Sequence, residues 1–318
     1  MTDAQPRILV VGEALIDVVP DAAGTPRDLP GGSPANVAIA LGRLERDVRL
    51  VTLLGDDARG ALVRTWLEAS NVTVLAQPTG SGRTSSAEVT LDASGAASYV
   101  FDLDWELSAV PEEACDVLHV GSIATVLDPG ADAVLAAVRA RRGRALVSLD
   151  PNARPAITPD RAGPLARVEE LVALADLVKV SDEDLDWLHP GHDPVATATR
   201  WAAAGPGLVV VTRGGEGAIA VRHDGTTLEV PGVPVRVADT VGAGDTFSGV
   251  LVDALIALGV HGADAAAALR ALSDRDVLGV VTTAAVGAAI NVSRPGADPP
   301  SRAELATALG TTPEADEE

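Results

Sequence analysis

Residues 239–247 read Asp239-Thr240-Val241-Gly242-Ala243-Gly244-Asp245-Thr246-Phe247. Val233, Val235 and Val237 form a strand-like run before this stretch, and an apolar pattern of helical period begins at Phe247. Because two glycines flank one alanine where the helix should begin, its first backbone N–H groups would be exposed at the positive end of the helix dipole. The stretch therefore predicts an anion site.

Asp245 is unexpected in such a site, because a carboxylate repels a bound anion. The conflict disappears if the anion is a phosphoryl group in transit and Asp245 accepts the proton of the attacking group. Taken alone, the stretch is equally compatible with a tight turn followed by a helix cap. Phosphoryl transfer is thus a hypothesis that needs support from the rest of the chain.

Composition limits the class of protein. The chain has 318 residues, enough for one large α/β domain with an appendage or for two modest domains. No apolar run approaches the roughly 20 residues that span a bilayer, and the N-terminus does not resemble a signal peptide, so we expect a cytoplasmic protein without a membrane partner. The formal net charge of −21 argues against binding to nucleic acid. The lone Cys115 excludes an intrachain disulfide.

Lysine is nearly absent: Lys179 is the only one among 24 basic residues. A Walker A loop requires Gly-Lys-Ser or Gly-Lys-Thr, and the chain contains neither. The lysine and His-Arg-Asp motifs of protein kinases are missing as well. If the chain binds nucleotide phosphates, it must use backbone amides, arginine or metal.

Apolar runs of strand length alternate with helical patterns along most of the chain. The runs are 7–12, 49–54, 117–120, 145–149, 177–180 and 208–212. This alternation predicts an α/β fold with a doubly wound, mostly parallel sheet flanked by helices. We expect a single domain over residues 1–313 and an acidic tail over 314–318.

A small second sheet is predicted from segments outside this alternation. Residues 86–101 alternate in polarity around Asp92-Ala93-Ser94-Gly95, as a two-stranded ribbon does. We expect this ribbon to join residues 15–30 and 72–75 in a separate β-sheet.

Ligands of a doubly wound sheet bind beyond the carboxyl ends of its strands. Polar groups follow the predicted strands at Asp17, Asp56, Asp150 to Arg154, Lys179 to Asp184 and Thr212 to Gly217. Together with residues 239–247, these groups predict one crevice built from the whole length of the chain.

Two segments of this crevice suit a sugar. Gly31-Gly32-Ser33-Pro34-Ala35-Asn36 offers paired glycines for close approach of a ligand and an amide for its hydroxyls, although a turn with a solvent-facing Asn is an equal alternative. Asp150-Pro151-Asn152-Ala153-Arg154-Pro155 holds Arg154 in a loop stiffened by two prolines, where it would bind hydroxyls or a carboxylate. A rigid connector with an exposed arginine is the alternative there.

Two further segments bear on the nucleotide. Residues 182–184 are three consecutive acids, which either favour a helix start or hold water around a magnesium ion. Residues 208–217 run from a strand into glycines, but they lack the full Gly-x-Gly-x-x-Gly pattern and the helix that follows it. A dinucleotide-binding fold is therefore not predicted.

Residues 31–38 and 239–247 resemble the N-terminal and C-terminal signatures of the ribokinase-like sugar kinases, the phosphofructokinase-B type. The two stretches stand in the family's order, about 200 residues apart, and the likeness covers nearly the entire chain. Gly55-Asp56-Asp57-x-x-Gly60 is similar to another segment of the family. Residues 12–17, 150–155 and 179–185 look most like the fructokinase and 2-keto-3-deoxygluconate kinase branch.

The resemblance implies that ATP donates its γ-phosphoryl group to a primary hydroxyl of a sugar, for which fructose is the leading expectation. Asp245 would accept the hydroxyl proton, and the amides of Gly242, Ala243 and Gly244 would bind the charge that develops on the transferring group. In a loose transition state the proton leaves late, so the position of the carboxylate matters more than a raised pKa.

The resemblance also implies where the ligands lie. The sugar would be held by Asp17, Gly31, Gly32, Asn36 and Arg154. The nucleotide side would be lined by Lys179, Ser181, Thr212, Gly214, Gly217 and Ala285. Mg²⁺ would accompany ATP, and a K⁺ site would begin at Asp239 and the Val241 carbonyl. Where the family often has Asn-x-x-Glu near the metal, this chain has Ser181 and Asp184, so Asp184 would act through water.

Three alternatives stay open. A 2-keto-3-deoxygluconate kinase would pair Arg154 with the carboxylate of its substrate. A nucleoside kinase would need aromatic residues to stack on a base, and the chain has four Trp, one Tyr and two Phe. A non-catalytic sugar-binding regulator is disfavoured by the intact Asp245 and its glycines.

The small sheet is expected to be a mobile lid, because phosphoryl transfer requires water to be excluded once both substrates are bound. Asp17 lies on the lid, so its closure would complete the sugar site. A two-stranded ribbon is marginally stable by itself. We therefore expect the face that carries Tyr99 and Phe101 to pair with a second subunit, giving a homodimer through the lids.

Overall fold

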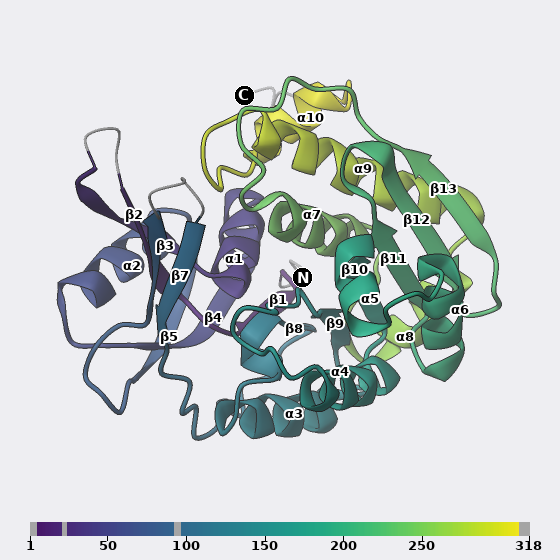
Figure 1. Cartoon of the computed structure of the whole chain (residues 1–318). Coiled ribbons are helices and arrows are strands. Elements are labelled where there is room, and N and C mark those ends of the chain that lie inside the picture. Colours follow the sequence, from purple (N-terminus) through teal and green to yellow (C-terminus); the bar gives the residue numbers. More distant parts are fainter. Residues whose placement is uncertain (1–4, 21–23, 92–96, 312–318) are drawn as a thin grey trace.

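Nine strands form the larger of two sheets in the computed structural model, which describes residues 5–20, 24–91 and 97–311 (Figure 1). Six of these strands coincide with the predicted apolar runs. In spatial order the nine are β13 (Thr227–Pro231), β12 (Gly217–Arg222), β11 (Leu208–Thr212), β10 (Leu177–Ser181), β9 (Leu146–Asp150), β8 (Val117–Gly121), β1 (Arg7–Val11), β4 (Asp47–Leu54) and β5 (Val72–Pro78).

The seven strands that run in space from β11 through β8 and β1 to β5 are parallel. At the other edge, β12 and β13 are added antiparallel. The chain builds outward from β1 to β4 and β5 on one side and from β8 onward on the other. The order therefore reverses between β1 and β8, which is the position where α/β sheets bind ligands. The predicted doubly wound, mostly parallel sheet is confirmed.

Helices cover both faces of this sheet (Figure 1). Along β1, Ile8 and Val10 pack into one apolar core with α1, α7 and α9, while Leu9 and Val11 pack into the other with α3, α4 and α6. This alternation is the two-residue period of a strand buried on both faces. The helices are α1 (Ser33–Arg43), α2 (Ala58–Glu68), α3 (Gly130–Arg141), α4 (Ala162–Leu174), α5 (Asp182–Leu188), α6 (Pro194–Ala204), α7 (Ala243–Ala257), α8 (Ala265–Ala271), α9 (Asp274–Val292) and α10 (Arg302–Ala308), with short 3₁₀ turns η1 (Ser122–Thr125), η2 (Gly214–Glu216) and η3 (Gly262–Asp264).

Helix α9 is long and apolar enough to cross a membrane by length and composition. Its buried residues include Val277, Val280, Val281 and Ala284, which belong to the core shared with α7. Gly287 of α9 lets the two helices approach, because a Cβ there would lie 2.6 Å from Cγ2 of Val250. We therefore interpret α9 as a core helix.

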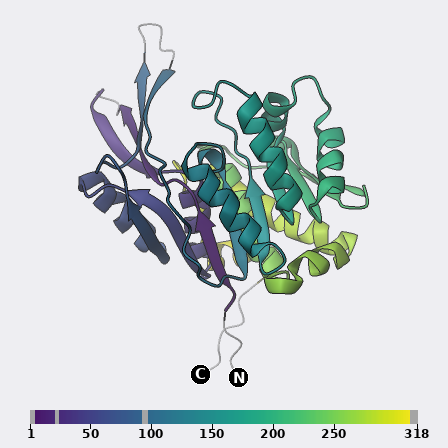
Figure 2. The same ribbon diagram turned by 90° about the horizontal axis from the view of Figure 1, so that it is seen from below.

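The smaller sheet has four strands in the order β3 (Pro26–Gly31), β2 (Leu15–Pro20), β6 (Ser86–Leu91) and β7 (Ala97–Asp102). Figure 2 shows the β6–β7 hairpin projecting from the main body. The predicted contributions of residues 15–30 and 86–101 to this sheet are confirmed. The turn at Asp92-Ala93-Ser94-Gly95, the side chain of Tyr99 and the acidic tail at 314–318 lie outside what the structure describes.

Two predicted strands were wrong. Residues 72–75 belong to β5, at the edge of the larger sheet, where Val72 pairs with Val48 of β4. The strand–helix–strand unit β4–α2–β5 places them there, because such a unit returns to the same sheet in parallel. Residues 233–237 do not form a strand but an exposed connection, in which Val235 is 39% and Val237 is 58% exposed. Helix α6 lies in a segment for which no element was predicted.

Candidate active site

The residue at the centre of the site is Asp245, in the first turn of α7. The N-cap of α7 is Gly242, with φ 72°, a left-handed conformation that glycine adopts without strain. A Cβ on Gly242 would also lie 2.6 Å from Cβ of Ala297. No side chain caps this end of the helix. The Ala243 amide makes a long hydrogen bond to the Thr240 carbonyl (3.3 Å), and no bond is made by the Gly242 and Gly244 amides within the described residues, so these remain available to an anion.

The carboxyl group of Asp245 is buried and fully oriented by neighbours. Its Oδ1 accepts a hydrogen bond from Ser33 Oγ (2.6 Å), and its Oδ2 accepts one from Asn36 Nδ2 (2.7 Å). Asn152 Nδ2 donates to Ser33 Oγ (2.6 Å) and lies 3.4 Å from Asp245 Oδ1. These four residues, the Asp245 cluster, join the starts of α1 and α7 to the loop after β9.

Burial raises the pKa of Asp245. The hydrogen bonds from Ser33 and Asn36 oppose the shift, the negative charge of Asp150 adds to it, and the positive charge of Arg154 opposes it. A raised pKa makes Asp245 a better proton acceptor than an ordinary aspartate. The sequence predicted only that the Asp245 carboxylate is well placed to accept the proton. Its raised pKa is a second reason to expect that Asp245 is the base.

Lys179 lies under the glycine turn rather than at the nucleotide side of the crevice. Its Nζ is 3.0 Å from Oδ2 of Asp150, which also accepts a hydrogen bond from Ser248 Oγ of α7 (3.0 Å). Nζ is also 2.8 Å from the position that a Cβ on Gly244 would occupy. A side chain at Gly244 would therefore have to displace the Lys179 ammonium, and the only lysine ties β9 and β10 to the base of α7.

Burial alone would lower the pKa of Lys179, but the nearby carboxylates of Asp150 and Asp184 raise it. The lysine therefore stays charged, with its side chain only 7% exposed. Its positive charge lies directly beside the turn whose amides are expected to bind the transferring phosphoryl group. Its Nζ donates to Asp150 Oδ2 (3.0 Å), which fixes the ammonium below this turn.

The predicted sugar residues line one side of the crevice. Asp17 of β2 is half-buried, and a Cβ on Gly31 would lie 2.4 Å from Asp17 Oδ2, so a larger residue there would displace the Asp17 carboxylate. Gly32 precedes α1 with φ 108°, so glycine is needed there too. Asn36 is buried, and its Oδ1 has no hydrogen-bond partner. The amide nitrogen of the same side chain is already used on Asp245.

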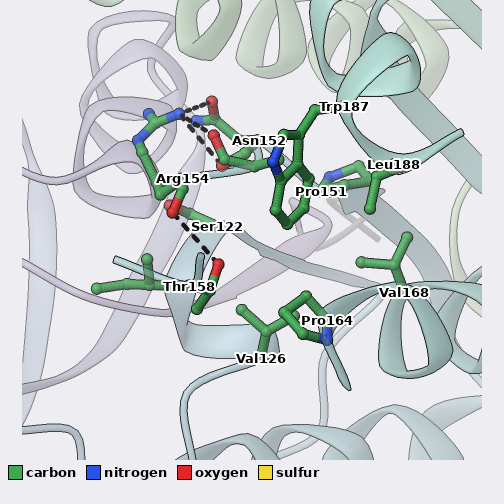
Figure 3. Close-up of a pocket in the computed structure, with 12 residues that line it drawn as sticks. Ser122, Val126, Pro151, Asn152, Arg154, Thr158, Pro164, Val168, Trp187 and Leu188 are labelled. Carbon is green, nitrogen blue, oxygen red and sulfur yellow. Dashed lines mark hydrogen bonds between the residues drawn. The ribbon is translucent and has the colours of Figure 1, made fainter. Parts of the chain in front are cut away.

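Arg154 is exposed and donates from Nη1 to Asn152 Oδ1 (2.6 Å) and to the carbonyls of Asn152 and Ala153. Figure 3 shows its guanidinium folded over Asn152 at the mouth of a pocket that Ser122 and Trp187 also line. The enclosed space there is only about 10 Å³, about one water molecule. The pocket is a gap behind Arg154 and not a sugar site by itself.

The predicted nucleotide residues occupy the ends of β10 and β11 and the face of α9. Ser181 and Thr212 are register partners on these adjacent strands. Gly214 has open space around it, whereas a Cβ on Gly217 would lie 2.1 Å from the Val230 carbonyl oxygen. Ala285 is half-buried in α9. In the described residues no hydrogen bond links Gly214, Gly217 or Ala285 to the Asp245 cluster.

The predicted metal residues are all engaged in local hydrogen bonds. Asp184 Oδ1 accepts from the Ala153 amide (2.9 Å), and its Oδ2 accepts from Ser181 in the capping box of α5. Asp239 accepts from the amides of Val241 (3.1 Å) and Gly296 (2.8 Å), and these bonds lower its pKa. The Val241 carbonyl accepts from Asn291 Nδ2 (2.8 Å). In the described ranges, no group of three His, Cys, Asp or Glu side chains converges on a metal position.

This donor set fits Mg²⁺ only as an ion carried by the nucleotide. Mg²⁺ keeps several waters and uses one or two carboxylates plus substrate phosphates, so a protein cage is not required. Carboxylate and carbonyl oxygens accept more than one bond, which leaves Asp184, Asp239 and Val241 some remaining capacity.

Sequence reasoning missed several residues of the site. Ser33 and Asn152 lie inside the quoted motifs but were given no role, although both bond to the Asp245 cluster. Ser248 follows Asp245 by less than one helical turn, and its contact with Asp150 is 98 residues distant in sequence. Glu13, next to the predicted sugar segment, was also missed. The signal for all four was a polar residue at the carboxyl end of a strand or the start of a helix.

A doubly wound sheet, a small second sheet and an oriented aspartate at a glycine-rich helix start together define a carbohydrate kinase. Residues 5–304 match the pfkB family of carbohydrate kinases, and the chain belongs to that family. It is 37% identical over 257 residues to the fructokinase of Rhizobium leguminosarum bv. trifolii, covering 77% of this chain and 78% of that one.

Solved structures agree with this assignment. The fructokinase of Xylella fastidiosa with bound ATP superposes with a TM-score of 0.87 and 27% identity, over 96% of this chain and 99% of that chain. A double mutant of the Vibrio cholerae fructokinase, bound to fructose, ADP and a potassium ion, superposes with a TM-score of 0.80 and 27% identity, over 97% of this chain and 100% of that chain. The resemblance given by the two signatures is confirmed.

Proposed function

We propose that this chain is an ATP-dependent fructokinase, which transfers the γ-phosphoryl group of ATP to a primary hydroxyl of fructose. The observation that carries the proposal is the burial and orientation of Asp245 by Ser33 and Asn36 beside the bare amides that begin α7. The similarity to enzymes named fructokinases supports fructose as the sugar.

In the proposed reaction the hydroxyl oxygen of the sugar forms a bond to the γ-phosphorus, and the bond to the β–γ bridging oxygen breaks to release ADP. The hydroxyl proton passes to Asp245, whose raised pKa favours accepting it. The amides of Gly242, Ala243 and Gly244 bind the charge on the transferring group, with the buried ammonium of Lys179 below them.

The sugar is held on the opposite side of Asp245. The unpartnered Oδ1 of Asn36 suits a hydroxyl donor, because a buried acceptor left without a bond costs about 1–3 kcal/mol. Asp17, Gly31 and Gly32 provide a carboxylate and close backbone approach, and Arg154 provides a guanidinium at the rim. This set matches a neutral polyol.

The nucleotide and ions complete the proposal. Ser181, Thr212, Gly214, Gly217 and Ala285 are assigned to the nucleotide side. Mg²⁺ would neutralise the triphosphate, with Asp184 reaching it through water, and K⁺ would bind near Asp239 and the Val241 carbonyl. The relatives' structures with ATP, and with ADP and potassium, support a nucleotide and an ion.

Three broader assignments belong to the same proposal. Residues 1–313 form a single functional unit whose small sheet is a mobile lid. The protein acts in the cytoplasm. It forms a homodimer through the lids, for which Val100 of β7 (59% exposed), on the face opposite Asp17 and Phe101, offers apolar contact area.

The test is ADP release measured over a panel of fructose, 2-keto-3-deoxygluconate and nucleosides, with Mg²⁺ and ATP. We expect the highest kcat/KM on fructose. A higher kcat/KM on 2-keto-3-deoxygluconate would overturn the choice of sugar, and preference for a nucleoside would overturn the sugar site. Binding of fructose without turnover on any acceptor would mean a sugar-binding regulator.

A further inference from the structure

Glu13 is a buried carboxyl group that the proposed reaction does not use. It follows β1 at the point where the strand order reverses, beside η1, which follows β8. Only 6% of Glu13 is exposed. A carboxyl group is rarely buried without a partner, so its contacts show what it holds in place.

The side chain of Glu13 reaches across the reversal point to η1. The Ala124 amide donates to Glu13 Oε2 (3.3 Å), and the Ser122 side chain lies close enough to lower the pKa of the Glu13 carboxyl. Ser122 is itself buried with φ 54°, a conformation that a residue with a side chain adopts only under constraint. Glu13 therefore fixes a strained turn at the edge of the crevice.

The backbone of Glu13 supports the sugar segment at the same time. A Cβ on Gly32 would lie 2.6 Å from the Glu13 carbonyl oxygen, so the glycine turn before α1 rests directly on Glu13. Ser122 lines the same pocket wall as Asn152 and Arg154 (Figure 3). Glu13 thus contacts both the Gly31–Gly32 turn and the Ser122–Ala124 turn, and the second of these forms part of the pocket wall behind Arg154.

Arg154 is also the charged group that acts on Glu13. Its guanidinium opposes the burial that raises the pKa of Glu13, and it acts in the same way on the carboxyl groups of Asp17 and Asp245. The other groups beside the Glu13 carboxyl, Ser122 and the Ala124 amide, are neutral.

We propose that Glu13 is a positioning residue for the sugar: it fixes the Ser122–Ala124 turn against the Gly31–Gly32 turn. It sets the KM for the sugar and leaves the transfer step to Asp245. The inference rests on the proposed function, because it assigns Glu13 to the sugar side of that site.

The proposal has a consequence for pH. Burial raises the pKa of Glu13 to about 7, so it ionises in the range where the enzyme is assayed. Ionised Glu13 accepts the Ala124 amide in a charge-assisted hydrogen bond, which fixes the turn more firmly than the neutral form does. The KM for fructose should therefore fall as the pH rises through about 7. Asp17 and Asp245 also have raised pKa values, so the variant without an ionisable group at position 13 is needed to assign the effect.

The experiment compares wild type with Glu13→Gln between pH 6 and 8.5, measuring kcat and the KM values for fructose and ATP. Gln resembles the neutral form of Glu13 and keeps an oxygen for the Ala124 amide. At pH 8 we expect the KM for fructose to rise about three- to tenfold, the difference between a charged and a neutral partner, with kcat within about twofold. At pH 6 the two proteins should have similar KM values, and the KM for ATP should not change.

Asp176→Asn is the matched control. Asp176 is another carboxyl group whose burial raises its pKa and which accepts a backbone amide, that of Val147 (2.9 Å), but it lies at the opposite ends of β9 and β10. It should leave the KM for fructose and its pH profile unchanged. An equal change in Asp176→Asn would mean that any buried carboxyl group has this effect, and would overturn the proposal.

Two other results would also overturn the proposal. In the first, Glu13→Gln keeps both the wild-type KM for fructose and its pH dependence. In the second, the kcat of Glu13→Gln falls while its KM for fructose stays constant. If Glu13→Gln does not fold, Ser122→Ala tests the same contact by removing only the hydroxyl, and it should raise the KM for fructose in the same pH range. Wild-type turnover on fructose in the same assay decides the proposed function separately, since the Glu13 inference depends only on the ratio of variant to wild type.

Discussion

The crevice and the lid sheet use ion pairs in opposite ways. In the crevice, Lys179 and Asp150 form a pair whose side chains are 7% and 1% exposed, and Ser248 bonds to the same carboxylate. In the lid, Arg83 and Asp102 form a pair of similar length whose side chains are 67% and 61% exposed. Water replaces a lost partner in the second pair but not in the first. The crevice is therefore built as a fixed frame, and the lid is held by contacts that cost little to break.

The largest effect is expected from breaking the buried pair. Lys179→Met leaves the Asp150 carboxylate buried without a cation, and Asp150 Oδ1 already has no partner. The free energy of unfolding should fall by about 3–5 kcal/mol. Urea unfolding measures this change. The matched variant Arg83→Met, which breaks the exposed pair, should cost less than about 1 kcal/mol.

The double variant Lys179→Met/Asp150→Asn sharpens the same comparison. With neither charge buried, it should be more stable than Lys179→Met alone. If the double variant is equally unstable, the loss comes from packing and not from the unpaired charge. If Arg83→Met is as destabilised as Lys179→Met, burial does not distinguish the two regions.

The second effect concerns the reacting group itself. Asp245→Asn keeps the shape and most of the hydrogen bonds of the Asp245 cluster but removes the proton acceptor. Turnover should fall by roughly 10² or more, while fructose binding measured by calorimetry largely survives. Turnover within a few-fold of wild type would show that Asp245 is not the base.

The third effect is at the rim of the crevice. Arg154→Ala removes one guanidinium that is exposed and bonded mainly to its own loop. A bond from arginine to a carboxylate contributes about 1.5–3 kcal/mol, and a bond to a neutral hydroxyl about 1 kcal/mol. The kcat/KM for fructose should therefore fall about tenfold, and that for a sugar acid considerably more. An equal loss on fructose and on 2-keto-3-deoxygluconate would mean that Arg154 does not bind a substrate carboxylate.

The sequence was most informative about the crevice where a motif is local. Residues 239–247 contain both the glycines and Asp245, so one stretch predicts the anion site and its base together. Polar residues at strand ends predicted Arg154 in the loop after β9, because parallel strands end at one edge of the sheet, whereas Asp17 lies within β2 of the small sheet and Asn36 in the first turn of α1.

What the sequence could not predict depends on contacts between distant residues. Lys179 was predicted at the nucleotide side from the family resemblance, but its partner Asp150 is 29 residues away and meets it only through the pairing of β9 and β10. The strand at 72–75 was assigned to the lid because a short alternating run has the same pattern at the edge of either sheet. The helix that precedes this strand, α2, indicated its sheet more reliably, because a strand–helix–strand unit returns to the same sheet.

The smallest effect is expected at the lid, and it tests whether the lid moves. Two contacts join the lid to helix α2. Arg59 donates to both oxygens of Asp28 on β3 (2.8 and 2.9 Å), and Asp57 accepts from the Thr84 amide (2.9 Å) two residues before β6. The Arg59–Asp28 pair is about one third exposed on each side. Such a pair contributes less than about 1 kcal/mol, so it can hold the lid without preventing closure.

Hydrogen exchange should therefore show that the amides of β6 and β7 gain protection when fructose and ADP bind, as expected for a lid that closes. In the free protein, Arg59→Ala should speed exchange in the lid strands about fivefold or less. Arg64→Ala is the matched control, because Arg64 lies on the same helix but pairs with Glu68 of that helix and not with the lid. If ligands protect only residues 239–250, or if both variants behave alike, the small sheet is a fixed wall of the sugar site. In that case the exposed ion pairs of the lid would show only that it lies at the protein surface. The comparison between a rigid crevice and a mobile lid would then be wrong.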